Sequence, residues 1–295
     1  MIFITFIYII LNLNYAITNM SIVLVNFFKN LLPYLFLFLI VNQLLIKTNI
    51  ILIFGYFLQL FLYPLFKINA KTCSLLLISL INGFPSSVLY SSIMVKENKV
   101  EANTTHNIAK YFFLPSFSFV FFIIYKNLTP LYFNIFLLSL YLPSFFFLLF
   151  YREKSQENYI KINDVKFDIL TSFNQFNYIN DLKSIFIETI YTLINILGMI
   201  SFYSIITLII PFNFIKGLFE FSIPSLSILS SNSNDLIKSL QLLIILVFSS
   251  FSSISQATIY LKDINLTTSS FIKTRIALLS LSIIIFILCI FVFFL

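Results

Sequence analysis

Charged side chains are scarce in this chain. They make up 10% of its 295 residues, whereas hydrophobic side chains make up 60%. Soluble domains of ordinary composition carry about 25% charged residues. A chain with so few charges cannot cover a globular surface with polar groups, so its composition excludes an ordinary soluble protein. The mean hydropathy of +1.00 agrees, and the main partner predicted for the chain is a lipid bilayer.

Several residue types that carry chemistry are also rare. The chain has no tryptophan, four glycines, two cysteines and one histidine. Cys73 and Cys289 lie far apart in apolar runs, so no disulfide framework is expected. His106 is isolated in a polar link, and the sequence has no P-loop, HExxH or GxGxxG motif. We therefore expect no enzyme, no metal site and no cofactor. The 18 basic and 11 acidic side chains are dispersed, so no nucleic-acid partner is expected either.

Long apolar runs dominate what is present. A membrane-spanning helix needs about 20 such residues, so the chain has room for about eight to ten membrane segments. The first run lacks the basic region and cleavage site of a signal peptide, and we interpret it as a span. The expected fold is an all-α, polytopic transmembrane bundle. The apolar runs cover residues 2–18, 22–46, 50–66, 72–95, 111–125, 131–150, 185–211, 214–230, 239–261 and 271–295.

One polar block interrupts these runs between residues 151 and 184. Its balanced acidic and basic residues predict a solvated cytoplasmic loop. The chain would then consist of a first span at 1–20, a first membrane half at 21–150, this loop, and a second membrane half at 185–295.

Two apolar stretches contain residues that a plain span disfavours. Asn82-Gly83-Phe84-Pro85-Ser86-Ser87 interrupts the first, and a Ser-rich run at 249–256 interrupts the second. Gly and Pro break the helical hydrogen-bond ladder, and freed backbone groups at membrane depth must be satisfied by protein or by a water-filled cavity. We interpret both as re-entrant helical hairpins. A Pro kink in the first and a Ser-rich helix face in the second are the alternatives.

The two interrupted stretches resemble each other. Ser86-Ser87-Val88 aligns with Ser252-Ser253-Ile254, and Lys96-Glu97 aligns with Lys262-Asp263, at one constant offset. Duplicated halves around a central site are common in transporters. We therefore expect two pseudo-repeats, each with a hairpin. If residues 72–95 return to the side they entered from, most lysines face the cytoplasm, as the positive-inside rule requires.

These features together resemble the sporulation integral membrane proteins of the YlbJ type, whose halves are nucleoside-recognition, or Gate, domains. The similarity runs in the family's order over residues 22 to 285. It rests on Leu31-Leu32-Pro33-Tyr34-Leu35-Phe36, Pro64-Leu65-Phe66, Asn82-Gly83-Phe84-Pro85-Ser86, Ile215-Lys216-Gly217-Leu218-Phe219-Glu220, Gln256-Ala257, Lys262-Asp263-Ile264 and Phe271-Ile272-Lys273-Thr274-Arg275-Ile276.

The resemblance implies a role in endospore formation. The protein would lie in the bacterial inner membrane, specifically the mother-cell membrane around the forespore, and would move dipicolinic acid towards the developing spore. We expect a secondary transporter or exporter of a small organic anion, and a homo-oligomer is compatible with this. A nucleoside-type transporter and a non-transporting membrane scaffold of the spore envelope are the alternatives.

The expected substrate site lies where the two interrupted stretches meet. Helix N-termini bind anions through free N–H groups and the helix dipole. Alternatively, the serines satisfy local backbone or let helices approach closely, Asn82 caps its helix, and Glu220 pairs with Lys216 one turn away. Glu220 is included because carboxylates within membranes are usually functional. The predicted substrate-binding residues are Asn82, Gly83, Pro85, Ser86, Ser87, Ser252, Ser253, Ser255, Gln256 and Glu220.

Overall fold

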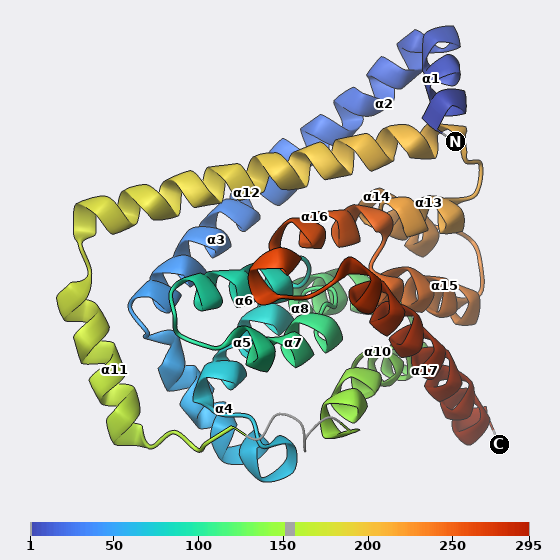
Figure 1. The fold of residues 1–295 in the computed structure, drawn as a ribbon. Helices are drawn as coiled ribbons and strands as arrows, with labels where there is room; N and C mark the ends of the chain where they lie inside the picture. The colour runs from blue at the N-terminus through green and yellow to red at the C-terminus, as the bar shows by residue number, and fades with distance from the viewer. Residues whose placement is uncertain (1, 151–156, 295) are drawn as a thin grey trace.

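A computed structural model of the chain describes residues 2–150 and 157–294, and within them it consists of helices joined by short links, with no strand (Figure 1). The all-α prediction is confirmed. The α-helices are α1 Ile2–Leu11, α2 Leu13–Asn26, α3 Leu32–Lys47, α4 Ile51–Phe66, α5 Ala70–Asn82, α6 Ser86–Lys96, α7 Ala102–Tyr111, α8 Phe117–Phe119, α9 Tyr125–Asn127, α10 Pro130–Phe150, α11 Ile162–Gln175, α12 Tyr178–Ile206, α13 Asn213–Phe219, α14 Ser222–Leu229, α15 Asp235–Phe248, α16 Phe251–Leu261 and α17 Thr268–Phe294.

The described part of the chain has four helical segments that are long and apolar enough to cross a membrane. The number rises to six if each of two bent helix pairs is one span. A multi-pass membrane protein is therefore supported, with fewer spans than the eight to ten expected. The four segments are Pro130–Phe150, Tyr178–Ile209, Asp235–Ile264 and Thr268–Phe293, and the bent pairs are Leu13–Lys29 with Leu32–Lys47 and Ile51–Phe66 with Ala70–Asn82.

The spans are fewer because apolar runs do not all form straight helices. The run at 111–125 contains a non-helical segment between α7 and α8, and the run at 214–230 is divided into α13 and α14. The first span, expected at 2–18, is not formed as predicted. α1 ends at Leu11 and α2 starts at Leu13, because the backbone leaves the helical region at Asn12.

The two predicted hairpins have different outcomes. In the first, α5 and α6 contact each other on either side of Gly83-Phe84-Pro85. In the second, α15 and α16 follow one another within one candidate span, Asp235–Ile264, so the prediction of a hairpin is wrong there. The second break is only two residues long, and Ser250 caps α16 at once by accepting a hydrogen bond from the Ser253 N–H at 3.4 Å.

The repeat interpretation gains support from the backbone. Gly83 has φ +73° and Ser249, at the same offset as the aligned residues, has φ +74°. After each second arm, an asparagine adopts the left-handed conformation, with φ 55° at Asn98 and 54° at Asn265. The helix order α5–α6–α7 is thus matched by α15–α16–α17. In Figure 1, α5 to α8 occupy the middle of the molecule, and α12 runs along one side as the longest helix.

The polar block is folded rather than a loop. Residues 151–156 lie outside the described part, but α11 occupies half of the remainder and α12 begins at Tyr178. The Glu157 carboxylate accepts hydrogen bonds of 2.7 Å from the Asn69 N–H and the Thr72 hydroxyl, and Asp168 lies 3.6 Å from the Lys71 ammonium. These contacts fasten the block to the start of α5. The prediction of a loop is wrong because the block forms helices, whereas most of its described side chains are exposed as expected.

Candidate binding site

The first break is pressed against another part of the backbone. A Cβ atom added to Gly83 would lie 2.2 Å from the Ser116 nitrogen, a distance that no side chain tolerates. Together with φ +73°, this explains why glycine is needed here. Gly83 therefore lies directly on the segment between α7 and α8.

That segment, Phe112–Ser116, is non-helical, and most of it is fully buried. Its Phe113 ring contacts Phe84 of the first break, with centroids 5.5 Å apart. The Phe113 carbonyl accepts a hydrogen bond of 3.1 Å from the Ser249 hydroxyl of the second break. Both breaks thus meet on one unwound segment, which the sequence analysis treated as part of a span. Pro115 inside the apolar run was the signal that could have revealed it.

Arg275 of α17 satisfies the freed carbonyls of this segment. The side chain is fully buried, and it donates hydrogen bonds to the Phe113 carbonyl at 2.6 Å and to the Lys110 carbonyl. Its guanidinium also lies 5.8 Å from the Phe113 ring centroid. Salt bridges within the described residues do not include Arg275. The geometry assigns this arginine to holding the unwound backbone, and its position as the single Arg within the last apolar run was the available signal.

A third helix break lies beside the first two, between α13 and α14. Phe219 contacts Phe251 of the second break at 5.3 Å, and Phe221 contacts Phe84 of the first at 4.8 Å between ring centroids. Glu220 stands between these two phenylalanines. One of the predicted site residues therefore lies where three breaks converge.

The Glu220 side chain is only 1% exposed. Its carboxylate accepts hydrogen bonds from the Ser222 N–H at 3.0 Å, the Ser222 hydroxyl at 2.8 Å and the Ile223 N–H at 3.4 Å. It thereby caps the first turn of α14. Glu220 lies outside the candidate spans, and its burial raises the pKa of the carboxyl group, while these hydrogen bonds oppose the rise. The expected ion pair with Lys216 is not among the salt bridges of the described residues.

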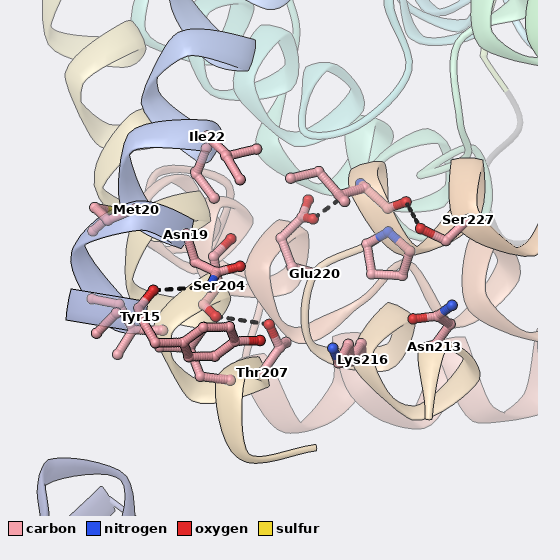
Figure 2. Close-up of a pocket in the computed structure, with 16 residues that line it drawn as sticks. Tyr15, Asn19, Met20, Ile22, Ser204, Thr207, Asn213, Lys216, Glu220 and Ser227 are labelled. Atoms are coloured by element: carbon pink, nitrogen blue, oxygen red, sulfur yellow. Dashed lines mark hydrogen bonds between the residues drawn. The ribbon is translucent and has the colours of Figure 1, made fainter. Parts of the chain in front are cut away.

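Glu220 lines a cavity of about 240 Å³ between α2, the end of α12, α13 and α14. Figure 2 shows Tyr15 facing this cavity from α2, with Lys216 and Glu220 on the opposite wall. The Glu220 carboxylate turns away from Lys216 towards the first turn of α14. The other polar side chains of the lining are uncharged: Asn19, Ser204, Thr207, Asn213 and Ser227. Lys216, which is half-buried, is the cation of this cavity.

The predicted serines are mostly engaged within the protein. The Ser87 hydroxyl donates to the Ala109 carbonyl at 3.4 Å, and the Ser255 hydroxyl lies 2.6 Å from the Tyr203 hydroxyl. The Gln256 amide donates to the Ser252 hydroxyl at 3.3 Å. These contacts favour the alternative in which the serines satisfy neighbouring groups.

The remaining predicted residues differ in how well they are satisfied. Ser86 and Pro85 are buried in the first turn of α6 and just before it, and the Ser253 hydroxyl lies 3.3 Å from that of Ser250. The buried amide atoms of Asn82 have no hydrogen-bond partner among the residues that the structure describes. Asn82 is therefore the residue of the first break that has polar groups to offer.

A second polar region was not predicted because its residues come from four helices. The fully buried Tyr90 hydroxyl of α6 lies near the Asn42 side chain of α3. The Tyr260 hydroxyl of α16 lies 3.3 Å from the Thr192 hydroxyl of α12. An ion pair of 2.9 Å between Lys96 of the first repeat and Asp263 of the second links the two repeats. No single stretch of sequence carries this pattern.

Metal binding has no support in the described residues, since no group of three or more His, Cys, Asp or Glu side chains gathers there. Comparisons of the chain with protein-family models, with curated proteins and with solved structures found no match. The fold and the geometry of the site therefore carry the functional argument.

Proposed function

We propose that this chain is a secondary carrier that moves a small organic anion across a bacterial cell membrane. The observation that carries the proposal is the convergence of three helix breaks on buried Glu220, beside a cavity that polar and apolar side chains line together. Transporters commonly form their substrate sites from discontinuous helices near the membrane centre. Irregular backbone at that depth occurs where protein buries it or where it lines a cavity.

Lys216 gives the cavity a cationic group for an anion, because the Glu220 carboxylate on the same wall is turned towards the first turn of α14. Lys216 lines it without a salt bridge among the described residues, and the neighbouring lining groups are hydroxyls and amides that donate hydrogen bonds. A volume of about 240 Å³ lies below the roughly 300–1,000 Å³ typical of sites for drug-sized ligands, so it suits a small solute. The resemblance to the sporulation family names dipicolinate, a small dianion, as the first substrate to test.

The proposed anion site thereby moves from the two predicted hairpins to this cavity. At the hairpins, the Ser86 N–H donates to the Gly83 carbonyl at 2.8 Å and the Ser253 N–H donates to Ser250. These helix ends are already occupied by their own chain. In the cavity, Asn19, Thr207 and Ser227 also donate to carbonyls of their own chain, whereas Lys216 forms no salt bridge among the described residues.

The alternative function is a non-transporting membrane scaffold of the spore envelope. The internal hydrogen bonds of Ser87, Ser255 and Gln256 favour it, because side chains committed to packing need no solute. A scaffold would use the same fold for contact with other envelope proteins.

Uptake of radiolabelled dipicolinate into proteoliposomes separates the two functions. A carrier gives saturable uptake that close analogues block and that uridine and an unrelated dicarboxylate do not. Lys216→Gln should reduce uptake, whereas Lys126→Gln, which removes a cation from exposed α9, should not. Saturable uptake of uridine in place of dipicolinate would instead favour a nucleoside-type transporter.

One result would contradict the proposed anion site. Equal uptake by Lys216→Gln and wild-type protein would remove Lys216 and its cavity from the mechanism. No uptake by folded wild-type protein of any of the three solutes would favour the scaffold.

A further inference from the structure

A buried carboxylate without a cationic partner is unusual in a membrane bundle. Glu220 is 1% exposed, and Lys216, one turn earlier on α13, forms no salt bridge with it. In a low-dielectric setting, an ionised carboxylate without a cation gains a proton more readily than it would in water. Glu220 lies outside the candidate spans, in the break between α13 and α14, and a buried carboxylate beside membrane spans is a candidate for an ion pathway or proton relay.

No salt bridge among the described residues neutralises the Glu220 carboxylate, so its negative charge is removed by binding a proton. Tyr15 and Lys216 are the titratable side chains of the cavity lining, and α12 contributes only uncharged groups there. On α15, which packs against α14, Asp235 and Lys238 pair with each other at 3.8 Å. Hydrogen bonds from Ser222 and Ile223 hold the ionised form, and burial acts in the opposite direction.

We propose that Glu220 is the proton-binding group that couples a proton gradient to movement of the anion; this inference rests on the carrier function proposed above. The step is a reversible protonation, in which one carboxylate oxygen takes a proton from one side of the membrane and releases it to the other. No bond besides O–H forms or breaks, and no oxidant or reductant takes part. Binding of the proton offsets one negative charge of the anion in the same cavity.

The position of Glu220 provides a route from protonation to movement. A protonated carboxyl group accepts hydrogen bonds from Ser222 and Ile223 less strongly than a carboxylate does. The cap of α14 therefore weakens when the proton binds. Phe219 and Phe221, the two neighbours of Glu220, contact the second and first breaks respectively. Loosening this turn thus changes the packing of both other breaks.

Infrared difference spectroscopy of the purified protein tests proton binding without any substrate. Acidification of wild-type protein should produce the carbonyl stretch of a buried carboxylic acid. Glu220→Gln should abolish the component of that band that Glu220 contributes, whereas Glu101→Gln, which removes an exposed carboxylate just before α7, should leave the band unchanged. The same band in Glu220→Gln protein would overturn the proposal.

Transport in proteoliposomes tests the coupling itself. In wild-type protein, an inward proton gradient should accelerate dipicolinate uptake. Glu220→Gln should lose this acceleration, whereas Glu101→Gln, which removes an exposed carboxylate just before α7, should keep it. Acceleration that survives in Glu220→Gln would overturn the coupling role.

The variant Ser222→Ala tests whether Glu220 titrates, because a purely structural role of Glu220 would not shift the pH midpoint of the infrared band. Removing its hydroxyl takes one hydrogen bond from the ionised carboxylate, so the pH midpoint of the infrared band should rise by about one unit. An unchanged midpoint would argue against Glu220 as the titrating group. Absence of uptake by wild-type protein would fault the carrier proposal, while the infrared band still decides whether Glu220 binds the proton.

Discussion

The two equivalent helix breaks solve one backbone problem with different chemistry. Both begin with a residue in the left-handed region, Gly83 at φ +73° and Ser249 at φ +74°. At the first, the absence of a side chain lets the backbone of Ser116 approach. At the second, the Ser249 hydroxyl reaches the Phe113 carbonyl instead. One unwound segment is therefore held by close contact on one side and by a hydrogen bond on the other.

The two breaks also differ in length, which explains why the helices on either side of them are arranged differently. The three-residue first break lets α5 and α6 contact each other, whereas the two-residue second break keeps α15 and α16 in one candidate span. A repeat in sequence thus does not require a repeat in geometry. The asymmetry leaves the third break, with Glu220, next to both.

The largest expected effect comes from closing the space at the first break. Gly83→Ala combines a left-handed φ, which costs about 1–2 kcal/mol, with a clash against the Ser116 backbone, which adds about 1–3 kcal/mol. We expect the free energy of unfolding in detergent to fall by about 2–5 kcal/mol. Gly198→Ala is the control, because nothing lies within 4 Å of its added Cβ. It should change stability by about 1 kcal/mol or less, in the stabilising direction. Equal losses in the two variants would show that the close approach at Gly83 is not what the break requires.

The next effect comes from the arginine that holds the unwound segment. Arg275→Gln removes donors from the Phe113 and Lys110 carbonyls, and a buried acceptor left unpaired costs about 1–3 kcal/mol. Thermal unfolding should show a loss of that size. Lys273→Gln, on the exposed side of the same helix, should stay within about 0.5 kcal/mol of wild type. A loss in the control as large as in Arg275→Gln would assign the effect to helix charge and not to these carbonyls.

Local chemistry decides which parts of this site the sequence could predict. The breaks were placed correctly because Gly83, Pro85 and the serines after Phe248 act on their own backbone. The unwound Phe112–Ser116 segment was not predicted, because Phe and Leu are also common in buried helices and only Pro115 indicated a break. Nor could it show that Arg275 would reach this segment, since contacts between residues 162 positions apart depend on the packing of whole helices.

The same limit explains the polar block and the cavity. Acidic and basic residues at 151–184 look solvated when counted, but Glu157 finds Asn69 and Thr72 only after the chain folds back. Glu220 was identified from its apolar surroundings alone, and its cavity is lined from four helices. A charged residue within an apolar run can be recognised in the sequence, whereas the side chains that surround it in the folded protein cannot.

A smaller effect separates strain from hydrogen bonding at the second break. Ser249→Gly and Ser249→Ala both lose the hydroxyl that donates to Phe113, but only glycine adopts φ +74° without strain. The alanine variant should be less stable than the glycine variant by about 1 kcal/mol. Chemical denaturation of the two proteins measures the difference directly. Identical stabilities would mean that backbone strain at this position is relieved by the surrounding structure.

The smallest effect concerns the charges that join the repeats. Lys96 pairs with Asp263 at 2.9 Å, although the sequence offset makes Lys262 the equivalent of Lys96 and Glu97 that of Asp263. The symmetric pair, Lys262 with Glu97, is not among the salt bridges of the described residues, and Glu97 pairs with Lys99 at 3.0 Å instead.

Double-mutant cycles with alanine at each pair measure this asymmetry. The Lys96 side chain is 61% exposed, so its coupling to Asp263 should be only about 0.2–1 kcal/mol and should weaken as salt is added. The cycle for Lys262 and Glu97 should give no coupling. Equal coupling in both cycles would mean that the repeats interact symmetrically in solution. Coupling in the first cycle alone would show that the two repeats differ at the ends of α6 and α16, as they do at the breaks beside Glu220.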